Sequence, residues 1–167
     1  IEKIIINKNI DYLLVYGDTD STLAGAIAAS KLRIPILHVE AGLRSFNKNQ
    51  PEEINRVLTD HISEICFAPT ENARDNLIRE GISEKKIALV GDVMEDMKLF
   101  FSSQADKNIK LKKKLSLEKK EYALVTIHRK ENTQDSLILE NILRALSSLD
   151  INIIFPLHPS TENQIEK

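Results

Sequence analysis

Two acidic residues stand at the ends of two apolar runs. Asp18 follows the run at residues 11–17, and Glu40 ends the run at residues 34–40. Such short runs are typical of buried strands, and in open parallel sheets ligands bind beyond the carboxyl ends of the strands. If the two strands are neighbours, Asp18 and Glu40 share one edge of the sheet. Like charges brought together there raise the pKa of one carboxyl, which can then donate a proton near neutral pH.

Two further acids open a predicted helix, where Pro51 is followed by Glu52 and Glu53. One interpretation is structural, because proline suits the first helical position and acids suit the positive end of the helix dipole. The other is catalytic, because the helix begins soon after the Glu40 loop and Glu52 can return to the same edge. In the catalytic interpretation, Glu53 only stabilises the start of the helix.

Basic residues near these acids offer partners for an anionic ligand. Arg44 follows a flexible turn, and we expect it to be free to pair with a phosphate or a carboxylate. Arg56 is expected to bind the substrate as well. His128 ends a later apolar run beside further basic residues, which suits phosphate binding. His158 ends the last apolar run and is a weaker candidate for substrate binding.

A metal site is a minor alternative. Asp18, Thr19 and Asp20 match the D-x-D pattern with which some glycosyltransferases hold a metal and a sugar-nucleotide diphosphate. Two acids in a loop are a weak signal, and Asp20 serves equally well as a helix cap. The histidines show no close-spaced zinc pattern, and no G-x-G-x-x-G fingerprint follows an apolar run. We therefore expect no metal and no cofactor.

Strands and helices alternate along the chain and must position these residues. The strand candidates lack polar alternation, as is typical of parallel strands covered on both faces; they lie at 11–17, 34–40, 64–69, 86–91, 122–128 and 152–158. The helical stretches lie at about 20–32, 51–62, 71–80, 93–115 and 134–148. Thr70 and Gly81 are the expected start cap and stop signal of one helix. This order predicts βαβ units and an α/β fold with Rossmann-like parallel sheets.

Composition is that of a soluble globular protein. The 167 residues are 42% hydrophobic and 29% charged, with a net charge of −2. The near-neutral balance argues against bulk binding of nucleic acid or anionic membranes. No apolar run approaches the ~20 residues of a membrane span. Cys66 is the only cysteine, so an intrachain disulfide is excluded; we expect a buried thiol and a reducing cytoplasm.

The chain is expected to carry parts of two domains. A lysine-rich stretch at 107–120 precedes a new apolar run at Tyr122, so we place a boundary near residue 117. Residues 1–116 would be the C-terminal part of a first Rossmann-like domain, and residues 117–167 the start of a second. No aromatic residues interleave with the lysines, which favours a solvated helix face over nucleic-acid binding. Because the chain begins at Ile1 without a methionine, we expect it to be a fragment.

Several motifs together resemble one enzyme family. "GDTDSTLAGAIAA", "HVEAGLRS", "PEEINRVLTDHIS", "APTENARDNL", "VGDVM" and "VTIHRKENT" occur in the order and near the spacing of the non-hydrolysing UDP-N-acetylglucosamine 2-epimerases. The resemblance is dense from Asp11 to Met94 and resumes from Tyr122 to His158. "HVEAGLRS" also separates this group from the hydrolysing epimerases. The family's N-terminal Gly-Thr-Arg-Pro-Glu loop and its C-terminal Ser-Gly-Gly segment are missing, and Glu95 replaces a tyrosine common in close relatives.

The resemblance implies a fold, an activity and roles for particular residues. It implies two Rossmann-like domains facing each other across a cleft, as in the GT-B glycosyltransferases. It implies an isomerase that eliminates UDP across C1–C2 of the sugar and adds it back through a bound glycal. By position, Asp18, Glu40 and Glu52 resemble the family's acid/base carboxylates, and His128 resembles its diphosphate-contacting histidine. It further implies a cytoplasmic homodimer with a UDP-sugar substrate that serves cell-surface polysaccharide biosynthesis.

Other functions remain open at this point. Closely similar sequences epimerise UDP-diacetamido-uronic acids at C2, and nothing in this sequence excludes that substrate. A GT-B glycosyltransferase would share the fold but need an acceptor site and little chemistry at C2. A binding or regulatory module would hold the nucleotide without turnover.

Overall fold

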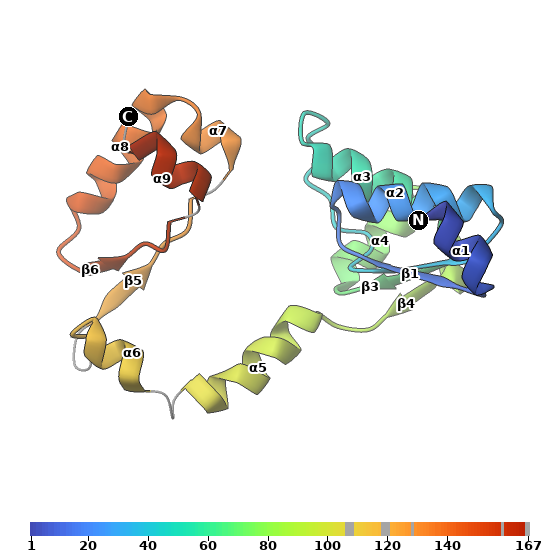
Figure 1. The fold of residues 1–167 in the computed structure, drawn as a ribbon, viewed down its shortest axis with the longest axis horizontal. Coiled ribbons are helices and arrows are strands. Elements are labelled where there is room, and N and C mark those ends of the chain that lie inside the picture. Colours follow the sequence, from blue (N-terminus) through green and yellow to red (C-terminus); the bar gives the residue numbers. More distant parts are fainter. Residues whose placement is uncertain (106–108, 118–120, 128, 158, 166–167) are drawn as a thin grey trace. The chain divides into compact units, whose positions relative to one another are not determined.

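A computed structural model describes residues 1–105, 109–117, 121–127, 129–157 and 159–165. The chain divides into two compact units, Ile1–Phe101 and Ser102–Lys167, which are described separately (Figure 1). The assignment of residues 1–116 and 117–167 to two Rossmann-like domains remains a prediction. Within the described residues, no helix combines the length and apolar character needed to cross a membrane.

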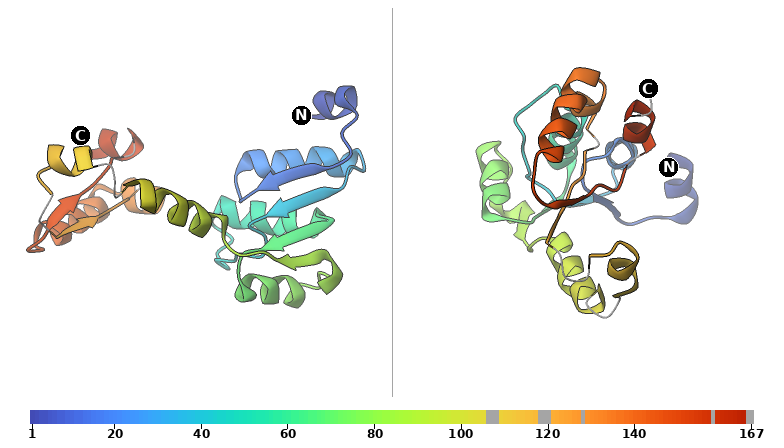
Figure 2. Two further views of the ribbon diagram at one scale, coloured as in Figure 1. Left: turned by 90° about the horizontal axis from the view of Figure 1, so that it is seen from below. Right: turned by 90° about the vertical axis from the view of Figure 1, so that its left-hand side faces the viewer.

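A four-stranded parallel sheet forms the centre of the first unit. Its strand order is β1-β2-β3-β4, so strands that follow each other along the chain are neighbours in the sheet (Figure 2). The strands are β1 (Leu13–Tyr16), β2 (Ile36–Val39), β3 (Ile65–Ala68) and β4 (Ile87–Leu89). Each lies inside one of the apolar runs of the sequence. The predicted α/β class with parallel sheets is therefore confirmed.

Helices connect the strands of the first unit, as right-handed crossovers in parallel sheets require. The connecting helices are α2 (Asp20–Lys31), α3 (Pro51–Ile62), α4 (Glu71–Arg79) and the 3-10 helix η1 (Glu84–Lys86). Helix α1 (Glu2–Lys8) precedes β1, and α5 (Val93–Ala105) begins after β4. The expected cap of α4 is confirmed, since Oγ1 of Thr70 accepts from the amide of Ala73 at 3.1 Å. Gly81 follows α4 with a φ of +89°, as expected for a stop signal. Thr19, rather than Asp20, caps α2.

One face of this sheet packs against helices. Small residues let the helices approach it closely, and the core falls into two clusters. Near α2 the buried residues are Ile5, Val15, Ala26, Ala29 and Ile36. Near α4 they are Ala41, Cys66, Ala68, Ala73 and Leu77. The prediction of a buried Cys66 is confirmed, and burial raises the pKa of its thiol to about 12.

The opposite face of the sheet is less covered. Leu14 and Tyr16 of β1 are 45% and 60% exposed, and the residues that alternate with the buried ones on β2 and β3 are only half-buried. Because polar and apolar residues do not alternate in the strand candidates, we predicted strands that are covered on both faces of the sheet. Among the residues that the structure describes, this first unit covers one face.

The second unit contains a smaller parallel sheet. It pairs β5 (Tyr122–Leu124) with β6 (Asn152–Ile154). Its helices are the end of α5, then α6 (Ile109–Lys114), α7 (Lys130–Thr133), α8 (Ser136–Ser147) and α9 (Pro159–Ile165). Asp135 caps α8, with its carboxylate accepting from the amide of Leu137 at 2.9 Å. The single helix expected at 93–115 is described as two, α5 and α6.

Candidate active site

The first two strands place two acids side by side at the carboxyl edge of the sheet. In the β1–β2 register Tyr16 pairs with Val39, so the turns that follow are adjacent. Gly17 has a φ of +63°, which favours glycine, and Asp18 comes next. A Cβ at Gly17 would lie 3.3 Å from Oε2 of Glu40, so the Glu40 carboxylate lies against the turn that carries Asp18.

The surroundings of Glu40 make it harder to ionise. Burial raises the pKa of this carboxyl, the charges of Asp18 and Asp92 add to the increase, and Arg56 and His38 oppose it. The sequence-based argument anticipated the direction and the contribution of Asp18. It did not anticipate that burial is the largest cause, or that Asp92, after β4, faces the same group. A carboxyl with a raised pKa can deliver a proton near neutral pH.

Asp18 is held by residues of α3. The guanidinium of Arg56 forms an ion pair with its carboxylate and lies 3.1 Å from Oε2 of Glu53. Nδ2 of Asn55 donates to the carbonyl oxygen of Asp18 and to Oδ1 of Asp20, both at 2.9 Å. The arginine expected to bind substrate therefore contacts a candidate catalytic acid directly. Asp20 is occupied by an amide within the protein.

The two acids at the start of α3 have different surroundings. Glu52 is exposed, whereas Glu53 is 4% exposed. The Glu53 carboxylate accepts from the amide of Ser45 at 2.8 Å, from its hydroxyl at 3.0 Å and from the amide of Phe46 at 2.9 Å. Burial opposes ionisation, but these hydrogen bonds and Arg56 outweigh it and lower the pKa of Glu53. The interpretation that Glu53 only stabilises a helix start is therefore wrong: it anchors the loop before α3.

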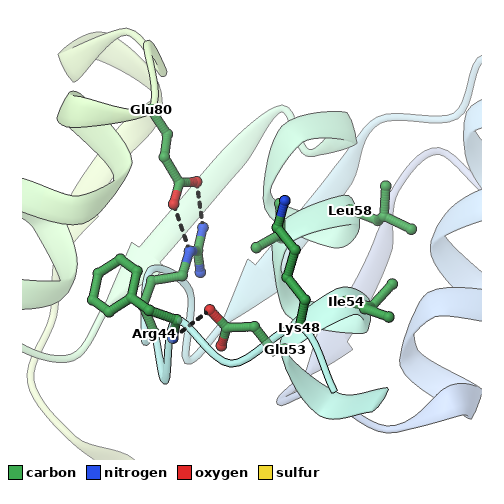
Figure 3. A pocket seen from close by; sticks show the side chains of 8 residues that line it. Arg44, Lys48, Glu53, Ile54, Leu58 and Glu80 are labelled. Atoms are coloured by element: carbon green, nitrogen blue, oxygen red, sulfur yellow. Dashed lines mark hydrogen bonds and ion pairs between the residues drawn. The ribbon is translucent and has the colours of Figure 1, made fainter. Parts of the chain in front are cut away.

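The expectation that Arg44 is free for a phosphate is also wrong. Its side chain is 1% exposed, and its Nη1 lies 2.8 Å from Oδ2 of Asp60. Its Nε and Nη2 each donate to a Glu80 oxygen at 2.7 Å, which Figure 3 shows as a paired contact. Burial opposes the charge, but the hydrogen bonds and charges of Glu80 and Asp60 prevail and raise the pKa of Arg44. Its partners come from the ends of α3 and α4, which sequence spacing does not reveal.

Sequence reasoning missed a buried pair beside the two turns. His38 on β2 and Asp60 on α3 are fully buried. Nδ1 of His38 lies 2.6 Å from Oδ1 of Asp60, and its Nε2 lies 2.8 Å from the carbonyl oxygen of Gly17. Oδ2 of Asp60 accepts from the amide of Gly42 at 3.1 Å. A histidine within an apolar run, two residues before the acid, was the available signal.

A cavity of about 420 Å³ is lined by residues of α3, of the segment before it and by Glu80. Ile54 and Leu58 project from α3, and Arg44 and Lys48 belong to the segment that precedes this helix (Figure 3). The lining residues of the cavity are Arg44, Phe46, Lys48, Glu53, Ile54, Val57, Leu58 and Glu80. Neither Asp18 nor Glu40 lines it, so the acids and the cavity are separate features.

The two histidine candidates and the possible metal site are the remaining predictions from the sequence. His128 and His158 lie outside the described residues, so their roles stay predictions. Among the residues that are described, no group of three or more His, Cys, Asp or Glu side chains could hold a metal ion. The acids of the D-x-D triplet are instead bound by Arg56 and Asn55.

One family model matches the whole chain. The family model described as "UDP-N-acetylglucosamine 2-epimerase" matches residues 1–167. A "UDP-N-acetylglucosamine 2-epimerase homolog" of Methanococcus maripaludis is 54% identical, and the UDP-2,3-diacetamido-2,3-dideoxy-D-glucuronate 2-epimerase of Pseudomonas aeruginosa is 51% identical. Each match covers 100% of this chain and 47% of the relative.

A solved structure is also similar to this chain. The crystal structure of UDP-GlcNAc 2-epimerase from Methanocaldococcus jannaschii, in complex with UDP-GlcNAc and UDP, matches with a TM-score of 0.88 and 47% identity. The match covers 99% of this chain and 47% of that one. The chain thus spans about half the length of the relatives it matches.

Proposed function

Because this chain belongs to the UDP-N-acetylglucosamine 2-epimerase family, we propose that the whole protein interconverts UDP-N-acetylglucosamine and UDP-N-acetylmannosamine. The observation that carries the proposal is the pairing of Asp18 and Glu40 at the carboxyl edge of the sheet, with the pKa of Glu40 raised. Epimerisation at C2 needs one group that removes a proton and another that returns it. Two adjacent carboxyls in different surroundings can divide these tasks.

The proposed reaction is an elimination followed by an addition. A carboxylate removes the proton from C2, and the C1–O bond to UDP breaks, which leaves a glycal and UDP in the site. A proton then returns to C2 on the opposite face, and UDP adds back to C1. The net change is inversion at C2, with no redox step and no added reactant.

The surroundings of the acids suggest how they divide the work. Glu40, with its raised pKa, suits the group that donates a proton. Asp18, which is held by the cationic Arg56, suits the group that accepts one. Glu52 is the third acid/base candidate, and its exposure at the first turn of α3 leaves it accessible to a ligand. By resemblance, His128 would contact the diphosphate of the leaving group.

Two substrates deserve a direct comparison. Relatives named UDP-N-acetylglucosamine 2-epimerase, at 46% identity, support the first substrate. The relative at 51% identity that is named for UDP-2,3-diacetamido-2,3-dideoxy-D-glucuronate supports the second. Both reactions invert C2 of a UDP-sugar and require the same carboxyl chemistry. We give preference to UDP-N-acetylglucosamine because more of the similar proteins carry that name.

Hydrogen exchange at C2 tests the proposal. The full-length protein is incubated in D2O with each UDP-sugar, and the sugar is followed by NMR. We expect deuterium at C2 and appearance of the C2 epimer. A GT-B glycosyltransferase would leave C2 unlabelled, and a binding module would bind UDP without turnover. Exchange with the diacetamido-uronate sugar alone would refute the proposed substrate, and absence of exchange with both UDP-sugars would refute C2 epimerisation.

The setting of the enzyme is part of the same proposal. The family resemblance supports a homodimer in the cytoplasm that supplies sugar nucleotides for cell-surface polysaccharides. The single buried Cys66 is compatible with a reducing compartment. Sedimentation of the full-length protein at several concentrations would test the dimer, and a monomer throughout would contradict it.

A further inference from the structure

The His38–Asp60 pair links the two acid-bearing turns. His38 is 0% exposed and Asp60 is 1% exposed. Through its two ring nitrogens, His38 contacts Asp60 at 2.6 Å and the carbonyl oxygen of Gly17 at 2.8 Å. Gly17 directly precedes Asp18, and His38 lies two residues before Glu40. A single side chain of β2 therefore contacts the turn after β1 and the end of α3.

Packing alone does not explain a histidine at this position. On the same face of the sheet, Ile36 precedes it on β2 and Cys66 pairs with it on β3, and both are buried. An apolar side chain would suit these neighbours. An imidazole buried there loses its hydration, which is unfavourable unless both ring nitrogens find partners. The two hydrogen bonds of His38 meet that requirement.

Both partners of the ring are acceptors. A carbonyl oxygen such as that of Gly17 can only accept, so Nε2 donates to it. The carboxylate of Asp60 already accepts from the amide of Gly42 and lies 2.8 Å from Arg44, so it accepts from Nδ1 as well. His38, Asp60 and Arg44 thus form a continuous chain of buried contacts.

Asp60 also fixes the backbone that carries Glu40. Glu40 has a φ of +72°, which is uncommon for a residue with a side chain. Strained backbone of this kind persists where its surroundings over-determine it. Here the amide of Gly42 donates to Asp60 at 3.1 Å, and the amide of Ala41 donates to the carbonyl oxygen of Phe67 at 3.1 Å. The turn is thus held from α3 and from β3.

We infer that His38 and Asp60 are positioning residues for the epimerisation proposed above, on which this inference rests. His38 holds the turn that carries Asp18, and Asp60 holds the turn that carries Glu40. Together they set the separation of the two carboxyls without touching the sugar. A misplacement of about 1 Å can lower a rate by about 100-fold, so their loss should appear in kcat.

Two substitutions in the full-length protein test the two hydrogen bonds of His38 one at a time. The amide nitrogen of His38→Gln lies near the original Nε2 and can still donate to Gly17, whereas that of His38→Asn lies near Nδ1 and can donate only to Asp60. We expect His38→Asn to lower kcat by about 100-fold and His38→Gln by less, with UDP affinity unchanged in both. Wild-type kcat in a folded His38→Asn variant would overturn the inference.

Thr59 provides a matched control on the same helix. It is 0% exposed, and its Oγ1 has no hydrogen-bond partner within the described part of the chain. Thr59→Val keeps the shape of the buried side chain and breaks no described contact, so it should retain wild-type kcat. If His38→Asn and Thr59→Val lose activity equally, or if kcat and UDP affinity fall together, the role of His38 is structural only.

The pH profile supplies a readout that a purely structural role would not move. Burial raises the pKa of Glu40, as do the charges of Asp18 and Asp92, whereas Arg56 and His38 lower it. His38→Asn removes one of the two side chains that lower this pKa. The limb of the kcat/KM profile that belongs to Glu40 should therefore move to higher pH, while Thr59→Val leaves it in place. A profile that His38→Asn does not move contradicts the inference.

A measurement without catalysis separates failure of the inference from failure of the proposed function. If the wild-type protein exchanges no hydrogen at C2, the proposed function fails, and this inference about the reaction fails with it. If it does exchange, nitrogen NMR of histidine-labelled full-length protein tests the contact directly. The Nε2 of His38 should carry a proton that is hydrogen-bonded to the carbonyl oxygen of Gly17. An Nε2 of His38 that carries no proton would overturn the inference, even if every variant failed to fold.

Discussion

Glu52 and Glu53 are consecutive acids with opposite surroundings, so substitution of each by glutamine is a matched test of the site. Glu53→Gln should destabilise the protein, because one carboxylate oxygen becomes an amide group that faces a donor. Its present donors are the amide and hydroxyl of Ser45, the amide of Phe46 and the guanidinium of Arg56. Glu52→Gln changes an exposed side chain and should leave stability almost unaltered.

The magnitude follows from the contacts of Glu53. A hydrogen bond to a charged group contributes about 1.5–3 kcal/mol, and a buried donor left unpaired costs about 1–3 kcal/mol. These contributions overlap, so we expect Glu53→Gln to lower the free energy of unfolding by about 3 kcal/mol. For Glu52→Gln we expect a change within about 0.5 kcal/mol, as for ordinary surface substitutions.

Denaturant unfolding and C2 exchange of the full-length variants measure the two effects separately. Glu52→Gln should keep the wild-type unfolding midpoint and lower kcat by about 10²–10⁴-fold, the scale of a general acid or base. Glu53→Gln should lower the midpoint and reduce kcat much less. If Glu53→Gln unfolds like the wild type, the loop anchor is refuted. If both variants lose activity equally, Glu52 serves the helix start and not the chemistry.

Acidification should erase the stability difference between the wild type and Glu53→Gln. Burial works against ionisation of Glu53, but its hydrogen bonds hold its folded-state pKa below the ordinary value for a glutamate. A depressed folded pKa contributes stability that is present above the unfolded pKa and is lost as pH falls through the folded pKa. The difference in free energy of unfolding between the wild type and Glu53→Gln should be largest at neutral pH and should decrease below about pH 4. A stability difference that does not change with pH would contradict the stabilising role of the Glu53 carboxylate.

The remaining predictions concern the chemistry. Asp18→Asn and Glu40→Gln in the full-length protein should each lower kcat by about 10²–10⁴-fold, and wild-type C2 exchange in either variant removes that acid from the mechanism. His128→Ala should reduce kcat and weaken UDP binding together, because a donor to the leaving phosphate stabilises the transition state. An unchanged dissociation constant for UDP would exclude His128 from the site. EDTA should not affect the rate, since elimination needs only acids, bases and a bound leaving group. Loss of activity in EDTA that Mg²⁺ restores would support a metal site at the D-x-D triplet. The 167-residue chain expressed alone should not epimerise.

Local patterns in the sequence were sufficient to predict the elements and the place of the acids. Each apolar run contains a strand, because short apolar runs bounded by turn residues favour strands. Thr70 and Gly81 marked the ends of α4, because caps depend on residues within one helical turn. Asp18 and Glu40 could be assigned to one edge, because parallel strands end on the same side of a sheet. The short helices α1 and α7 were not predicted, since brief elements lack a long hydrophobic period.

Which charged groups meet was decided by the tertiary structure. Arg44 is separated from Glu80 by 36 residues and His38 from Asp60 by 22, and no local pattern encodes those contacts. Folding of α3 and α4 against the sheet brings Asp60 and Glu80 to Arg44, and turns an apparent ligand-binding arginine into a buried structural one. The same packing buries Glu53 and leaves its neighbour Glu52 exposed. Side-chain type limits what a residue can do, but burial and the partners that packing supplies determine its charge state and its role.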